Sequence, residues 1–129
     1  LDYREFARLY QYVSSLGERY WHRCYLVLVT MDAKSDQTMY IDHIDKAMEG
    51  MEKAIRQNIR KNDICTRYSS LQHLIILVEA EESYIPDILQ RIFMNYYDAY
   101  GRNDFLPQYE YRKMTQASDG IPGKTEDED

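Results

Sequence analysis

The residues of this chain that could do chemistry gather in one stretch, from Arg60 to Leu77. Ser69, Ser70 and His73 lie close together in it, and a hydroxyl near an imidazole is the beginning of a nucleophilic site. Such a site also needs an acid that orients the imidazole. The sequence places no carboxylate evidently suited to that role, so we do not expect a serine nucleophile.

The histidines and cysteines form a second set of candidate residues, in this case for a metal. Metal sites place such residues at characteristic short spacings along the chain, and the positions here share no such spacing. Buried thiols and surface imidazoles are the simpler interpretation. We therefore expect no metal site and no cofactor among the five residues concerned: His22, His43, His73, Cys24 and Cys65.

The elements that must position these residues follow from the hydrophobic pattern. Apolar side chains at steps of three and four predict helices over residues 3–16, 38–59 and 83–100. Apolar runs predict strands over 24–31 and 71–78, with shorter strands over 63–68 and 108–113 and a polar loop over 32–37. After the leading helix, this order predicts an α+β domain with the ferredoxin-like βαββαβ arrangement, an antiparallel sheet with both helices on one face.

Length and charge narrow the class of protein. The chain has 129 residues, the size of one domain, and its 16 basic and 22 acidic residues give a net charge of -6. Proteins whose main task is to grip nucleic acid or an anionic membrane need a positive field. We expect neither partner for this domain.

The sequence also gives an expectation for the cellular compartment and for whether the chain is part of a longer protein. No apolar run approaches the roughly 18–20 residues of a membrane span. The two cysteines, Cys24 and Cys65, are too few for a disulfide scaffold. We expect a cytoplasmic domain. Because the chain begins at Leu1 without a methionine, we expect it to be part of a longer protein.

The stretch from Arg60 to Leu77 resembles the core of the diguanylate cyclase (GGDEF) family. In that family a helix ends in Arg-x-x-Asp, a strand carries Arg-Tyr, and a Gly-Gly-Asp/Glu-Glu-Phe turn precedes an apolar strand. The spacing agrees without a gap, and Asp45 falls on the aspartate of the family's Gly-His-x-x-Gly-Asp motif. The resemblance covers residues 25–113 and implies the ferredoxin-like fold predicted above.

The family signature is altered at each position of the turn. Two serines replace the glycines that let the backbone approach the nucleotide phosphates, and a leucine replaces a metal-binding carboxylate. The positions concerned are Ser69, Ser70, Leu71, Gln72 and His73.

The other nucleotide-site positions that the resemblance implies are altered as well. The second metal-binding aspartate has Thr30 as its counterpart, or Asp32 if the alignment shifts by two. Asp36 lies near the guanine-contacting asparagine position, and with Asp45 it completes the vestigial positions. Magnesium prefers carboxylate and phosphate oxygens, and phosphoryl transfer relies on that metal. We therefore expect a non-catalytic, degenerate member of the family.

Arg60 and Asp63 match the inhibitory Arg-x-x-Asp site through which relatives bind cyclic di-GMP. A guanidinium can bind a phosphate or a guanine edge, and a carboxylate can accept from the base. The alternative is purely structural: Arg60 is a solvated cation at a helix end and Asp63 a turn residue.

The sequence therefore predicts three segments and a regulatory role. Residues 1–22 form a connector helix, 23–117 a degenerate GGDEF-like domain, and 118–129 a disordered acidic tail. The domain would relay signals within a larger bacterial signalling protein, by packing against its other domains or by forming a homodimer through the leading helix. The alternatives are a cyclic di-GMP or nucleotide receptor that uses Arg60 and Asp63, and a residual enzyme with altered metal ligands.

Overall fold

The structure is a computed structural model that describes residues 23–33, 41–100 and 105–114, together with positions 4, 7, 8 and 11. The elements follow the order β1 (Tyr25–Ala33), α3 (Ile41–Asn58), β2 (Ile64–Ser69), β3 (Gln72–Leu77), α4 (Tyr84–Tyr100) and β4 (Phe105–Lys113). This is the predicted βαββαβ sequence of elements, and the α+β class is confirmed.

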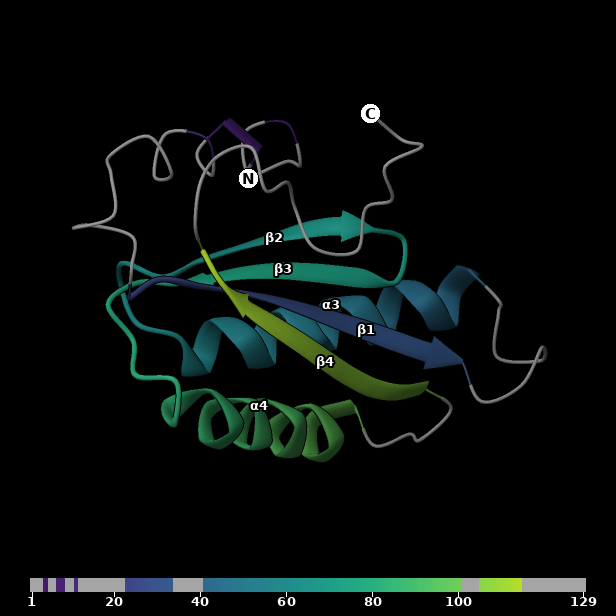
Figure 1. The fold of residues 1–129 in the computed structure, drawn as a ribbon. Coiled ribbons are helices and arrows are strands. Elements are labelled where there is room, and N and C mark those ends of the chain that lie inside the picture. Colours follow the sequence, from purple (N-terminus) through teal and green to yellow (C-terminus); the bar gives the residue numbers. More distant parts are fainter. Residues whose placement is uncertain are drawn as a thin grey trace.

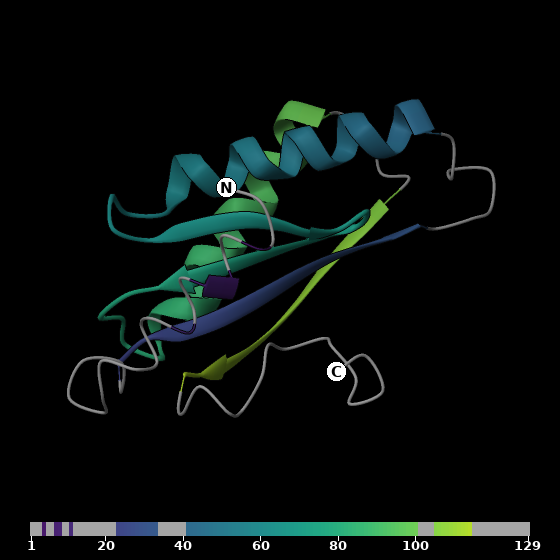
Figure 2. The same cartoon turned by 90° about the horizontal axis from the view of Figure 1, so that it is seen from above.

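The four strands form one antiparallel sheet in the order β2-β3-β1-β4. Two connections cross over through helices, which places β1 at the centre between β3 and β4. Figures 1 and 2 show α3 and α4 side by side on the same face of this sheet, as predicted. The arrangement leaves the turn between β2 and β3 at one end of the sheet and the junction of α3 with β2 at the other.

The main core lies between the sheet and the two helices. Alternate residues of β1, which are Tyr25, Val27, Val29 and Met31, point into it and are at most 9% exposed. The helices contribute their apolar stripes, because residues three and four apart share one side of a helix. These stripes include Met48, Met51, Ile55, Ile85, Leu89, Ile92 and Tyr96.

The second face of the sheet carries a smaller apolar cluster. Its buried members are Cys24, Leu26, Leu28, Leu74, Ile76 and Met114, each at most 2% exposed, and Ile64, Tyr68 and Val78 pack against them. Side chains of a strand alternate between the two faces, and both faces of β1 are apolar. The unbroken apolar run of β1 therefore reflects burial on both sides, as the sequence indicated.

Two strand boundaries differ from the prediction. Asp32 and Ala33 belong to β1 rather than to a loop, and β4 begins at Phe105, three residues before the predicted start. The reason is mutual pairing: Ala33 lies opposite Phe105 and Asp32 opposite Leu106. Pro107 did not prevent the extension because β4 is an edge strand, where the missing amide is tolerated.

Several predictions fall outside the described residues. The leading helix of residues 1–22 is represented only by four isolated helical positions, and the acidic tail of 118–129 by none. Asp36 and most of the loop that contains it are also outside the described part. Within the described part, no helix is long and apolar enough to cross a membrane.

Candidate functional site: the two ends of the β2–β3 hairpin

The turn between β2 and β3 is held by a chain of side-chain hydrogen bonds. The amide of Leu71 donates to Ser69 Oγ over 3.4 Å, and this hydroxyl donates to Gln72 Oε1 over 2.9 Å. The side-chain amide of Gln72 in turn donates to Thr30 Oγ1 over 3.1 Å, which joins the turn to β1. Arg67 donates to the carbonyl of Ser70 over 3.2 Å. The polar groups of this end therefore satisfy one another.

The structure separates Thr30 and Leu71, the two counterparts of the family's metal-binding carboxylates. Thr30 lies opposite Gln72, and both line the second face of the sheet. Leu71 instead lies on the helix-side face together with Met31. The Met31 amide donates to the Leu71 carbonyl over 2.8 Å, and both side chains pack in the helix-side core. Neighbouring strand residues project to opposite faces, so the side chains of Thr30 and Leu71 do not converge.

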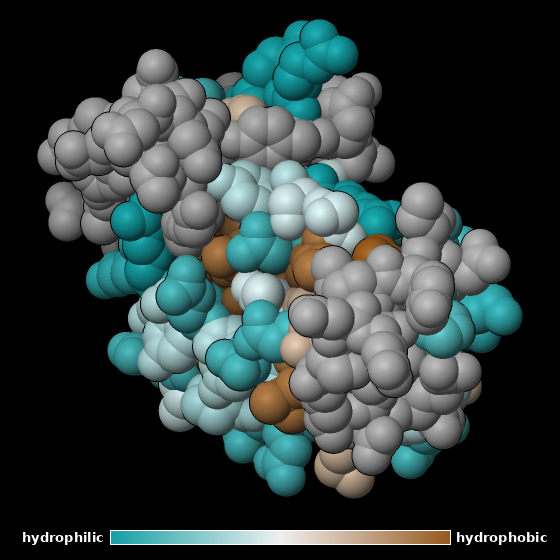
Figure 3. Space-filling model, turned by 90° about the vertical axis from the view of Figure 1, so that its right-hand side faces the viewer, coloured by the Kyte–Doolittle hydropathy of each residue, from teal (hydrophilic) through white to brown (hydrophobic). Residues whose placement is uncertain are grey.

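The remaining vestigial positions are also dispersed. Asp32 shares a polar hollow of about 220 Å³ with Thr30 and Gln72 on the second face, whereas Asp45 is exposed on α3. Among the described residues, no three His, Cys, Asp or Glu side chains lie close enough to hold a metal ion. Figure 3 looks onto the end of the molecule that carries the β2–β3 turn, where the described surface is mainly hydrophilic with small hydrophobic spots.

His73 occupies the phenylalanine position of the family signature and lies in the core. Its side chain is fully buried, and neither ring nitrogen has a hydrogen-bond partner among the described residues. Burial, which disfavours the charged imidazolium, lowers the pKa of His73 from 6.5 to about 4, against an opposing effect of Glu52. His73 is therefore a neutral core residue, not an accessible acid or base.

At the opposite end of the hairpin, Asp63 joins the end of α3 to the end of β3. Its Oδ2 accepts from the Arg60 amide over 2.8 Å and from Arg60 Nε over 3.3 Å. Its Oδ1 accepts from the Val78 amide over 2.9 Å. The side chain of Asp63 is only 1% exposed, so it is inaccessible to a ligand in this arrangement.

Arg60 is more open than its partner, with 48% of its side chain exposed. Its guanidinium donates to the Val78 carbonyl and lies over the ring of Tyr84, 5.6 Å from the centroid. A hollow of about 200 Å³ beside it is lined by Arg60, Lys61, Asn62, Asp63, Val78 and Glu79. One cation is thus partly available at this corner, while the carboxylate is not.

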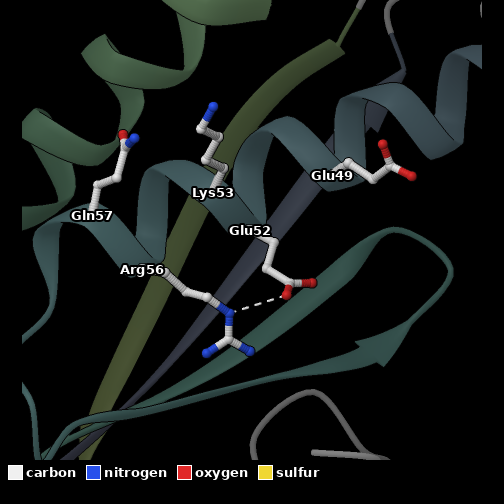
Figure 4. A pocket seen from close by; sticks show the side chains of 5 residues that line it. All are labelled: Glu49, Glu52, Lys53, Arg56 and Gln57. Atoms are coloured by element: carbon white, nitrogen blue, oxygen red, sulfur yellow. Dashed lines mark hydrogen bonds and ion pairs between the residues drawn. The ribbon is translucent and has the colours of Figure 1, made fainter.

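A larger hollow, of about 480 Å³, lies along α3 and is lined by Glu49, Glu52, Lys53, Arg56 and Gln57 (Figure 4). Figure 4 shows Glu52 and Arg56 directed toward the β2–β3 hairpin and paired with each other, over 3.0 Å. Arg56 also donates to the Cys65 carbonyl over 3.4 Å. Because two carboxylates balance two cations there, the hollow does not favour an anionic nucleotide.

Sequence reasoning missed the residues that close both ends of the hairpin. Val78 supplies both backbone groups that bind the Arg60–Asp63 corner, and Met31 occupies the face that Leu71 shares. No local sequence pattern indicates that Val78 binds this corner, because Val78 is fifteen positions from Asp63. The alternation of faces along β1 could have indicated Met31, had the pairing of β1 with the turn been known.

The comparisons with known proteins agree on the fold. No protein-family model matches the sequence, and no curated protein matches it in sequence. Among solved structures, diguanylate cyclase SiaD in complex with its activator SiaC from Pseudomonas aeruginosa matches with a TM-score of 0.71 at 14% identity, over 98% of this chain and 49% of that chain. This chain therefore spans about half of that protein.

In two further solved structures, the match covers a larger share of the solved chain. A DGC protein from Thermotoga maritima matches with a TM-score of 0.64 at 19% identity, over 90% of this chain and 84% of that chain. The FimX GGDEF domain from Pseudomonas aeruginosa matches with a TM-score of 0.70 at 13% identity, over 92% and 80%. The chain has the fold of GGDEF diguanylate cyclase domains, as the resemblance implied.

Proposed function

We propose that this chain is a non-catalytic regulatory domain, a degenerate GGDEF-like module of a larger cytoplasmic bacterial signalling protein. The observation that carries the proposal is the chemistry of the turn between β2 and β3. At the two positions where the family places metal carboxylates, this chain has Thr30, a hydroxyl that accepts from the Gln72 amide, and Leu71, an apolar side chain that packs with Met31 in the helix-side core.

The energetic consequence is large. Neutral oxygens are poorer magnesium ligands than carboxylates, and catalysis of phosphoryl transfer depends on the charge that the metal neutralises. A loss of transition-state stabilisation of about 4 kcal/mol reduces a rate about a thousandfold. Two misplaced or missing carboxylates are expected to reduce turnover below detection.

A role in protein assembly fits this fold. The matched solved structures include a diguanylate cyclase bound to a protein activator, so domains of this architecture occur in regulatory complexes. We propose that this chain acts through contacts with other domains of its parent protein or with a second copy. Its net charge of -6 favours protein partners over nucleic acid or anionic lipid.

The second candidate function is a receptor for cyclic di-GMP or another nucleotide at the Arg60–Asp63 corner. The half-exposed guanidinium of Arg60 and the adjacent hollow with Lys61 favour it. The buried Asp63 opposes it, because a ligand would have to break bonds to two backbone amides to reach the carboxylate. The hollow of about 200 Å³ also offers little room for a guanine base together with its phosphate.

Isothermal titration calorimetry separates the two functions. The unmutated protein is titrated with cyclic di-GMP, and with GTP plus magnesium, alongside Arg60→Ala and the control Lys53→Ala, which removes an α3 cation away from the corner. The regulatory proposal expects no binding of either nucleotide at ligand concentrations of hundreds of micromolar. Binding of cyclic di-GMP that Arg60→Ala abolishes and Lys53→Ala retains would establish the receptor instead.

A further inference from the structure

The second face of the sheet requires a cover that α3 and α4 do not provide. Its cluster of Cys24, Leu26, Leu28, Leu74, Ile76 and Met114 is at most 2% exposed, yet both helices pack on the other face (Figures 1 and 2). Large contiguous apolar surfaces on a protein normally mark an interaction site. Because these exposures are those of the single chain, another segment of the same chain must exclude water from these side chains.

The described positions near the start of the chain indicate which segment this is. Positions 4, 7, 8 and 11 are helical, and the purple fragments that represent them lie on the side of the sheet away from α3 and α4 (Figures 1 and 2). Arg4, Arg8 and Gln11 are exposed, whereas Ala7 is half-buried. On a helix, positions 4, 8 and 11 fall on one side, so that side faces solvent.

If the helix extends over residues 3–16, as the sequence predicts, its opposite side is apolar. With 100° per residue, Phe6 and Val13 would lie almost directly opposite Arg4, and Leu9 and Tyr10 would flank them. A helix over residues 3–16 would be about 21 Å long at 1.5 Å per residue. The nine residues of β1 extend about 30 Å, so one helix of this length can cover most of the cluster. Cys24, which follows this segment closely in the sequence, is itself a cluster member.

We propose that residues 1–22 dock on the second face of the sheet through this apolar side and complete the core of the domain. A displacement of this connector segment would then act directly on the domain, because it would expose side chains of β1 and β3. Self-association through this helix would compete with docking, since both use the same apolar side. This docking would occur in a catalytic and in a non-catalytic domain alike.

The two cysteines give a selective readout. Cys24 belongs to the second-face cluster and Cys65 to the helix-side core; both are buried thiols. Alkylation of each by a maleimide reagent, followed by peptide mass spectrometry, reports the opening of each face separately. Global unfolding accelerates both thiols, whereas undocking of residues 1–22 accelerates Cys24 alone.

The test compares Phe6→Glu/Leu9→Glu with the control Arg8→Glu/Gln11→Glu, which adds carboxylates on the exposed side. We expect labelling of Cys24 to accelerate at least tenfold in the first variant, with Cys65 changed less than twofold and the control unchanged. Leu9→Ala, which adds no charge, should give about threefold at Cys24 alone. Equal acceleration of both thiols in both apolar-side variants, or no acceleration, overturns the proposal. Protection of Cys24 in the unmutated protein that increases with protein concentration assigns the cover to a second copy and also overturns it.

Discussion

The two ends of the β2–β3 hairpin depart in different ways from the family motifs that they resemble. At the turn, the residue types differ from the signature, and exposed or half-buried neutral groups bond to one another, as in Ser69, Gln72 and Thr30. At the other end, the residue types of the Arg-x-x-Asp motif remain, but Asp63 is buried and bonded to backbone amides. The contrast teaches that a motif preserves residue identity without preserving access to it.

The two ends should also differ in what they contribute to stability. Buried carboxylates that satisfy backbone donors stabilise a fold, because removing them strands the donors. The turn is solvated, and beside it lies His73, whose ring nitrogens find no partner among the described residues. We therefore expect the corner to stabilise the domain and the turn end to weaken it.

The largest effect is expected from Asp63→Ala. The substitution leaves the amides of Arg60 and Val78 without their acceptor, and each stranded donor costs about 1–3 kcal/mol, so the free energy of unfolding should fall by about 4 kcal/mol. Urea denaturation measures the change. Asp45→Ala, at an exposed carboxylate of α3, should change it by less than about 0.5 kcal/mol. Equal effects of the two substitutions would contradict a structural role for the corner.

The next effect concerns His73 and pH. Since burial lowers its pKa from 6.5 to about 4, the unfolded chain binds more protons than the folded chain between these values. The free energy of unfolding should therefore fall as the pH drops from 6.5 toward 4, by about 3 kcal/mol in total from this group, and this contribution should be constant above 6.5.

His73→Phe isolates that contribution. The variant should lack this part of the acid sensitivity, and above pH 7 it should be more stable by about 1–2 kcal/mol, because two buried polar nitrogens are removed. Denaturant melts of both proteins at pH 5 and 7.5 provide the measurement. Parallel pH profiles would show that the imidazole is not buried as described.

The smallest effect is expected at the turn. Gln72→Ala removes the hydrogen bonds to Ser69 and Thr30, but these groups can bond to water instead. The free energy of unfolding should change by no more than about 0.5–1 kcal/mol. A loss as large as that of Asp63→Ala, measured in the same urea series, would remove the contrast between the two ends.

Much of the fold was predictable because its signals are local. The apolar spacing of α3 and the runs of β1 and β3 predicted their type and order correctly. The ends of β1 and β4 were not predictable, because Asp32 is ordered by pairing with Leu106, and Ala33 by pairing with Phe105, across the sheet. A residue's own neighbours in sequence carry no information on such a pair.

The candidate site also has features that local spacing predicted and features that depend on distant contacts. Spacing placed Ser69, Ser70 and Leu71 at the turn, where the structure also has them. It did not reveal that Thr30 and Leu71 face opposite sides, because facing depends on register, and one step of register reverses it. Nor did it reveal the burial of Asp63, which depends on the distant Val78 amide.

The central claim, that this domain lacks catalysis because its turn end cannot assemble a metal site, is tested most directly by rewriting the turn. The substitutions are Ser69→Gly, Ser70→Gly, Leu71→Asp, Gln72→Glu and His73→Phe, made with and without Thr30→Asp. Conversion of GTP to cyclic di-GMP is measured with magnesium or manganese, beside the unmutated protein. We predict no detectable product from any of the three proteins, because the carboxylates at positions 30 and 71 would lie on opposite faces. Synthesis by the rewritten protein without Thr30→Asp would contradict the argument from opposite faces, because Asp32, the remaining carboxylate, lies on the same face as Thr30; synthesis by the unmutated protein would contradict the claim outright.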